Sequence, residues 1–134
     1  MNNRNTPAIA FIGVGLMGHG IIGNLLKGGF RVTALDHPGN RPLDDLRALG
    51  LETGGSIRVL AAKAEVVFIC VTGSPEVEDV MLSADGVLAG IDPGTIVVDC
   101  STAEPERTLA LAEKVAGLIG AEQRTVRVSG ADFH

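Results

Sequence analysis

The sequence contains no tyrosine and no tryptophan, and its aromatic content is only 3%. Without tyrosine, the chain cannot supply the tyrosine and lysine pair on which the short-chain dehydrogenases depend. It also has no G-x-x-x-x-G-K-[ST] run, which excludes a P-loop, and no G-x-S-x-G nucleophile elbow for a Ser-His-Asp hydrolase. These absences exclude several common enzyme classes.

Basic residues and long apolar runs are also scarce. The chain has 11 lysines and arginines against 16 acidic residues, a formal charge of −5, so we expect no nucleic acid and no anionic membrane as partner. No run approaches the roughly 20 apolar residues of a membrane span, and the polar start, Met1 to Pro7, is unlike a signal peptide. We therefore expect a soluble, cytoplasmic protein.

Only two cysteines occur, Cys70 and Cys100, and each ends an expected strand. Small buried thiols are the favoured interpretation over a disulfide or metal ligands. The three histidines lie far apart and have no metal-ligand spacing with the cysteines, so we assign no metal site.

The chain is long enough for one domain, residues 1–134, with an ordinary hydrophobic core. Short β-branched runs alternate with segments of helical period, which predicts an α/β fold: a doubly wound, mainly parallel sheet of the Rossmann type. The expected strands are 8–12, 31–36, 51–53, 65–71, 95–100 and 125–128. Helices are expected between them, beginning near Gly18, Leu43, Ser56, Ser74 and Pro105.

The run Gly13-Val14-Gly15-Leu16-Met17-Gly18 fits the pattern G-x-G-x-x-G. The pattern alone is weak, but here a buried strand ends at Gly13, a helix is expected near Gly18, and Asp36 ends the next strand at about the 20-residue spacing of a dinucleotide site. Gly13 would permit the tight turn, Gly15 the approach of the diphosphate, and Gly18 the packing of helix on strand. The unpaired amides of that helix would face the diphosphate.

Asp36 predicts the choice of cofactor. Its carboxylate can accept hydrogen bonds from the adenosine ribose and would repel the 2′-phosphate of NADP, which favours NAD. Arg41 on the same loop can offset that repulsion and leaves NADP as the alternative. The adjoining His37 is included in the predicted cofactor site.

Further site residues are expected where the central strands end, because ligands of doubly wound sheets lie beyond the carboxyl ends of the strands. Val71, Thr72 and Gly73 would lie under the cofactor. Ser101 and Thr102 either offer hydroxyls near the nicotinamide or cap the helix expected from Pro105, and the residues leave both interpretations open.

Three ordered segments, residues 11–18, 71–77 and 99–105, together resemble the 3-hydroxyisobutyrate dehydrogenase (β-hydroxyacid dehydrogenase) family over about residues 8–118. The resemblance implies reversible NAD(P)-dependent oxidation of small β-hydroxy acids, with Thr102 contacting the cofactor. The family's substrate segment D-A-P-V-S-G-G has only Val128-Ser129-Gly130 as its counterpart here, so Ser129 and Gly130 are the candidate substrate residues in a divergent C-terminal segment.

The family's catalytic lysine comes from a helical second domain, and this sequence ends at His134 before one begins. We therefore assign no catalytic residue, and expect dinucleotide binding with little turnover unless that domain is supplied. The alternatives are a non-catalytic nucleotide sensor and a structural remnant. Apolar surface left uncovered near residues 126–133 would favour self-association into a homo-oligomer.

Overall fold

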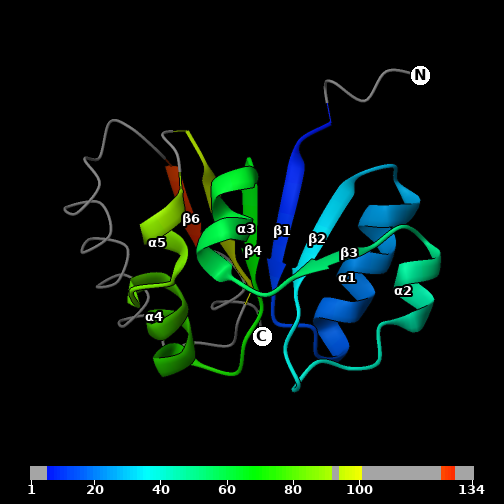
Figure 1. Ribbon diagram of the computed structural model, residues 1–134, viewed down its shortest axis with the longest axis horizontal. Coiled ribbons are helices and arrows are strands. Elements are labelled where there is room, and N and C mark those ends of the chain that lie inside the picture. The colour runs from blue at the N-terminus through cyan, green and yellow to red at the C-terminus, as the bar shows by residue number, and fades with distance from the viewer. Residues whose placement is uncertain (1–5, 92–93, 101–124, 129–134) are drawn as a thin grey trace.

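A computed structural model describes residues 6–91, 94–100 and 125–128. Its centre is a six-stranded sheet in the order β3-β2-β1-β4-β5-β6, in which every neighbouring pair is parallel (Figure 1). The strands are β1 (Ala8–Ile12), β2 (Arg31–Leu35), β3 (Glu52–Gly54), β4 (Val66–Ile69), β5 (Ile96–Asp99) and β6 (Thr125–Val128). The doubly wound parallel sheet predicted from the alternating pattern is confirmed.

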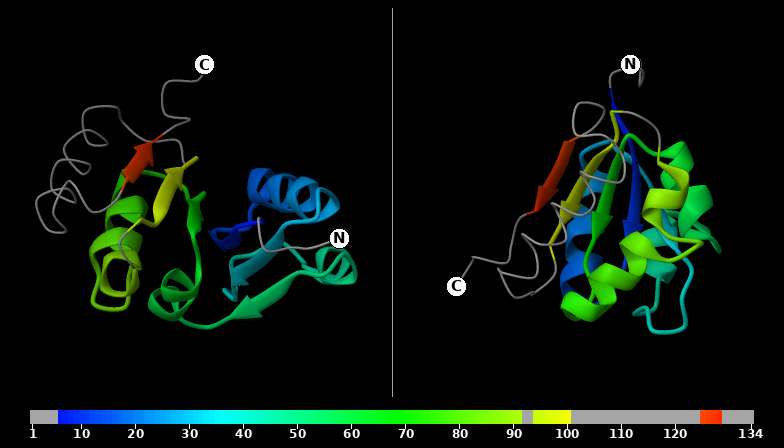
Figure 2. Two further views of the ribbon diagram at one scale, coloured as in Figure 1. Left: turned by 90° about the horizontal axis from the view of Figure 1, so that it is seen from above. Right: turned by 90° about the vertical axis from the view of Figure 1, so that its left-hand side faces the viewer.

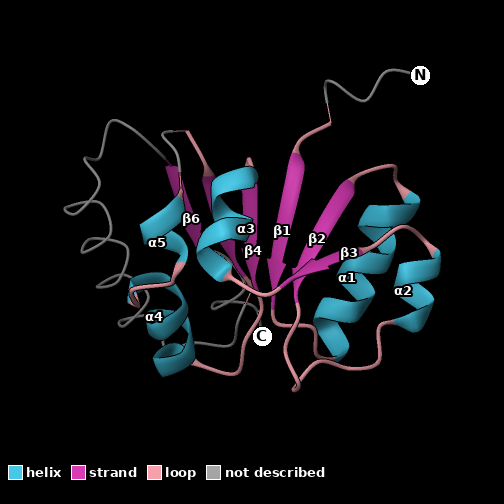
Figure 3. Cartoon of the chain, in the orientation of Figure 1, coloured by secondary structure: helices cyan, strands magenta, loops and turns pink. Residues whose placement is uncertain are grey.

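Helices lie on both sides of the sheet (Figures 2 and 3). On one face, α1 (Leu16–Lys27) and α2 (Asp44–Ala48) bury Ile22 and Leu46 against Phe11. On the other face, α3 (Ile57–Lys63), α4 (Ser74–Leu82) and α5 (Val87–Gly90) pack over β1, β4 and β5. Because both faces are covered near the centre, β1 is apolar along its whole length and buried from Ile9 to Ile12.

The strand order reverses between β1 and β4. From β1 the chain winds through β2 to β3 at one edge, and α3 then carries it back to β4 on the other side of β1. The connections that leave the carboxyl ends of β1 and β4 therefore diverge, and a crevice forms at this switch point.

Several elements differ from those expected from the sequence. Strands β4 and β5 are shorter than the expected ranges 65–71 and 95–100. Strand β3 begins at Glu52 rather than Leu51, because the Leu51 amide donates to Leu46 O at 3.0 Å and closes α2 instead of joining the sheet. Helix α1 begins at Leu16, two residues before Gly18. The single turn α5 was not expected, since four residues ending in glycine carry little helical signal.

Other local signals are confirmed. Ser56 caps α3, and its Oγ accepts a hydrogen bond from Val59 N at 3.3 Å. Strand β6 pairs with β5 as expected. The helix expected from Pro105 lies outside the described residues. Among the residues described, no helix combines the length and apolar character needed to cross a bilayer.

Candidate functional site

The glycine-rich loop between β1 and α1 is shaped by close backbone contacts. Gly13 has φ +99°, and a Cβ placed there would lie 2.1 Å from the carbonyl oxygen of Cys70 at the end of β4. A Cβ at Gly18 would lie 2.4 Å from Gly13 O. The first and third glycines are therefore required by the packing of the loop against β4 and α1.

Gly15 differs from the other two, because a Cβ there would meet nothing within 4 Å. It is the N-cap residue of α1, and neither a side-chain cap nor an acidic residue in the first turn occupies the helix amides. The open side of Gly15 therefore lies beside a helix terminus whose N–H groups are available to an anion.

The loop forms one wall of a crevice of about 750 Å³ at the carboxyl ends of β1, β2 and β4. Most of the predicted cofactor residues line it: the whole run from Gly13 to Gly18, together with His37, Val71 and Thr72. Ten lining residues were not predicted, and they include Gly39, Asn40, Pro75, Glu76 and Asp79. The last three belong to α4, which the motif did not connect with the site.

Asp36 lies at the end of β2, exposed, and its amide donates to Gly54 O at 2.8 Å. Its neighbours Leu35 and His37 form the crevice wall at this point, and its contact with a ribose remains a prediction. Gly73 is the N-cap residue of α4. The predicted residues Thr102, Ser129 and Gly130 lie outside the described part of the chain.

Comparison with known families identifies the domain. The family described as the NAD binding domain of 6-phosphogluconate dehydrogenase matches residues 8–132, nearly the whole chain. The chain belongs to that family. The chain is thus an NAD-binding domain with a doubly wound strand order, and the predicted resemblance to 3-hydroxyisobutyrate dehydrogenases is confirmed.

The relatives of this NAD-binding domain include a protein named as a nuclear factor and a protein named as dehydrogenase-like. Human cytokine-like nuclear factor N-PAC is 34% identical over 118 residues, covering 86% of this chain and 21% of the relative. A probable mitochondrial 3-hydroxyisobutyrate dehydrogenase-like protein of Arabidopsis thaliana is 35% identical over 97 residues, covering 72% of this chain and 32% of the relative.

Solved structures agree with the sequence comparisons. Mycobacterium tuberculosis 3-hydroxyisobutyrate dehydrogenase, solved with L-serine, aligns with TM-score 0.71 and 26% identity over 90% of this chain and 39% of that one. A protein called Psf3, solved with NADP+ and 2-OPP, aligns with TM-score 0.71 and 33% identity over 89% and 40%. The chain thus spans about a fifth to two fifths of the length of these relatives.

Asn40 connects the loop after β2 to the glycine loop of the NAD-binding domain. Its Oδ1 accepts a hydrogen bond from Val14 N at 3.4 Å, and its Nδ2 donates to Leu35 O at 2.9 Å. The Arg41 amide also donates to Val14 O at 2.8 Å. These contacts join the glycine loop to the loop that follows β2, and both loops line the crevice.

Replacing Asn40 by alanine is expected to lower dinucleotide affinity about threefold to tenfold, because removing one hydrogen-bonding side chain typically costs about 1 kcal/mol and here loosens both walls. Calorimetric titration measures the change. Asn24→Ala on the exposed side of α1 is the matched control and should bind as the parent does. Equal affinity in the two variants would show that Asn40 plays no part in shaping the site.

The two cysteines lie at the ends of adjacent strands. The pairing of Ile69 with Asp99 places Cys70 beside Cys100, and both are free, half-buried thiols. Burial raises the pKa of Cys70, and the nearby Asp99 carboxylate raises it further. Burial likewise raises the pKa of Cys100, with added repulsion from Cys70 and Asp99.

No group of three or more metal-ligating side chains gathers anywhere among the described residues.

A raised pKa keeps a thiol protonated at pH values where an ordinary thiol has begun to ionise, and only the thiolate reacts with iodoacetamide. The pH profile of alkylation of both cysteines should therefore rise at higher pH than in the urea-unfolded chain, as measured by mass spectrometry of the labelled peptides. In a Cys70→Ser variant, the profile of Cys100 should move toward lower pH, because one repelling group is gone. Coincident folded and unfolded profiles would contradict this prediction.

Proposed function

We propose that this chain holds NAD in the crevice as the cofactor domain of an oxidoreductase in which hydride passes between the nicotinamide and a small hydroxy acid. The observation that carries the proposal is the open side of Gly15 beside the uncapped first turn of α1. An anion there would meet backbone N–H groups and the positive end of a 12-residue helix.

The crevice fits a dinucleotide in size and chemistry. Its volume of about 750 Å³ lies within the usual range for small-molecule sites. The glycine loop would hold the diphosphate, Asp36 and His37 the adenosine ribose, and Val71 and Thr72 the nicotinamide end. A bound nicotinamide supplies the hydride acceptor, and the residues of this chain bind it and orient it.

Two carboxylates on α4, Glu76 and Asp79, line the crevice near Val71 and Thr72. Their charges would repel phosphate groups and so favour a diphosphate held at the α1 amides. Carboxylates accept hydrogen bonds from sugar hydroxyls, so these side chains suit a ribose better than a phosphate. The two carboxylates therefore favour the orientation in which the diphosphate lies at α1 and a ribose lies near α4.

The chemical step needs a general acid or base within hydrogen-bond reach of the reacting oxygen. The resemblance to the 3-hydroxyisobutyrate dehydrogenase family assigns that role to a lysine of a second, helical domain. On this proposal the chain alone binds dinucleotide with little turnover, and the hydroxy acid is engaged through Ser129, Gly130 and that domain. Location in the cytoplasm belongs to the same proposal.

Calorimetric titration with NAD, NADH and NADP, paired with a spectrophotometric assay on 3-hydroxyisobutyrate, tests the proposal. We expect saturable binding of NAD and NADH, weaker binding of NADP, and reduction of NAD close to background. Absence of binding by all three nucleotides would overturn the assignment. Rapid oxidation of the hydroxy acid would overturn the need for a second domain.

Asp36 governs the choice between the two cofactors on this proposal. Replacing it by asparagine removes the charge that would repel a 2′-phosphate, so affinity for NADP relative to NAD should rise about threefold to tenfold. Asp44→Asn, which changes another exposed carboxylate on α2, should leave the ratio unchanged. An unchanged ratio in Asp36→Asn would place the carboxylate outside the ribose site.

A second candidate function is a nucleotide-binding module without catalysis. It is favoured by the relatives called nuclear factors, at 34% identity, whose name states no reaction. A sensor must change when its nucleotide binds, so saturating NAD should alter the association state of the chain in sedimentation velocity. An unaltered association state favours the cofactor domain over the sensor.

A further inference from the structure

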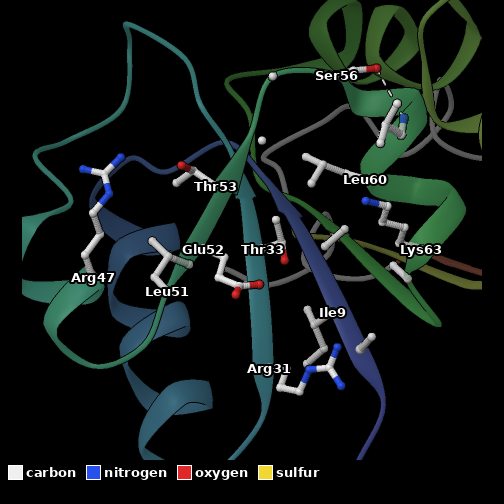
Figure 4. A pocket seen from close by; sticks show the side chains of 16 residues that line it. Ile9, Arg31, Thr33, Arg47, Leu51, Glu52, Thr53, Ser56, Leu60 and Lys63 are labelled. Atoms are coloured by element: carbon white, nitrogen blue, oxygen red, sulfur yellow. Dashed lines mark hydrogen bonds between the residues drawn. The ribbon is translucent and has the colours of Figure 1, made fainter.

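A second cavity, which we call the β3 trough, lies on the α3 side of the sheet and shares no lining residue with the crevice. Its volume is about 950 Å³. The residues that define it here are Ala10, Arg31, Thr33, Glu52, Leu60 and Lys63, which come from β1, β2, β3 and α3 (Figure 4).

The trough exists because of the strand order. Helices α1 and α2 pack on the opposite face, and α3 leaves the edge strand β3 to reach β4 on the far side of β1. The register sets Ala10 beside Thr33 and Thr33 beside Glu52 across the uncovered floor. Since alternate residues of a strand share a face, the small side chains of Ala8 and Ala10 lie on this floor and give the trough its depth.

Charged side chains gather over this floor without neutralising one another. In Figure 4, Lys63 extends from α3 toward Thr33, Glu52 lies beside Thr33, and Arg31 lies at the lower end of the same space. Within the described part of the chain, none of Arg31, Glu52 and Lys63 forms an ion pair; the salt bridges found there are His19–Asp45 and Arg58–Asp85. The trough thus has an excess of positive charge in a chain of formal charge −5.

The wall beside these cations is apolar. Leu60 faces the trough from α3, and Val59 on the same helix lines it while remaining 44% exposed. An exposed valine beside a cavity of ligand size offers contact area to an apolar group. The combination of methyl-lined wall and unpaired cations suits a molecule that has both an acid group and an apolar body.

We propose that the β3 trough binds a small organic anion with an apolar body, whose acid group lies between Arg31 and Lys63 and whose body lies against Ala10, Val59 and Leu60. The site is independent of the proposed dinucleotide function, because the two cavities have different lining residues. Glu52 disfavours an acid group placed directly beside it, since a carboxylate repels a second anion.

The test uses the intact chain and anilinonaphthalene sulfonate, a fluorescent probe with a sulfonate on an aromatic body. The probe should bind at one saturable site and be displaced by octanoate, which has a carboxylate on an alkyl chain. Arg31→Gln and Lys63→Gln should each weaken binding about threefold to tenfold, because each removes one charge-assisted contact. Glu52→Gln should strengthen binding about twofold to fivefold, because a repelling charge is removed.

Opposite responses to Lys63→Gln and Glu52→Gln distinguish this site from unspecific adhesion to apolar surface. Lys27→Gln, an exposed lysine on the other face of the sheet, is the control and should bind the probe as the parent does. Amide NMR shifts on adding the probe should concentrate at Thr33, Glu52 and Gly54. Shifts concentrated instead at Gly15 and Thr72, or equal affinity in all four variants, would overturn the proposal.

Discussion

A Gly15→Ala variant should fold as stably as the parent chain and lose at least about tenfold of its affinity for NAD, a free energy of about 1.4 kcal/mol. The φ angle of −84° is accessible to alanine, and a Cβ at this position meets no protein atom within 4 Å. The added methyl group would instead occupy the space that a diphosphate needs in order to reach the amides of α1.

Calorimetric titration measures the affinity of Gly15→Ala, and urea unfolding measures its stability. Gly20→Ala is the matched control, because Gly20 also has open space around it but lies within α1, away from the residues that line the crevice. That control should bind NAD normally and gain up to about 1 kcal/mol of stability from the better helix propensity of alanine. Undiminished binding by Gly15→Ala would remove the main support for the proposed function.

Gly13→Ala, unlike Gly15→Ala, should lose much of the free energy of unfolding. The position combines φ +99° with a Cβ contact of 2.1 Å to Cys70 O, a backbone atom that cannot move aside cheaply. Backbone strain and overpacking each typically cost about 1 to 3 kcal/mol, so a total of roughly 2 to 6 kcal/mol is expected. Urea unfolding monitored by circular dichroism measures it.

Gly50→Ala separates the two contributions to that loss. Gly50 has φ +110° but nothing within 4 Å of its Cβ position, so alanine there is strained without a clash. Its cost should be about 1 to 2 kcal/mol, which leaves the remainder of the Gly13 effect to the contact with β4. If the two variants lost equal stability, the glycine loop would not be locked against Cys70.

The two expectations divide the glycine loop by role. Gly13 holds the loop against the end of β4, where Cys70 N also donates to Ile12 O at 2.8 Å, and so sets the position of the first turn of α1. Gly15 contributes only by the absence of a side chain. Stability and ligand affinity therefore respond to different glycines of the same short motif, which makes the pair of variants informative about both.

The predictions that succeeded depend on local patterns. Continuous apolar residues mark β1, Ser56 marks the start of α3, and the glycine spacing marks the loop, because each signal is carried by residues close together in the chain. Contacts between distant segments are among the features that the sequence did not predict. Asn40 joins Val14 across 26 residues, and no pattern around either residue indicates that the two loops meet.

The amino-acid sequence by itself determined the class of fold and the position of the glycine loop before the N-terminus of α1, since hydrophobic period and glycine positions restrict the backbone locally. Only the tertiary structure decided that α4 supplies carboxylates to the crevice, that Cys70 and Cys100 adjoin, and that Arg31, Glu52 and Lys63 share one trough. The physical reason is that strand order and register bring these groups together, and both are set by packing of the whole sheet rather than by neighbouring residues.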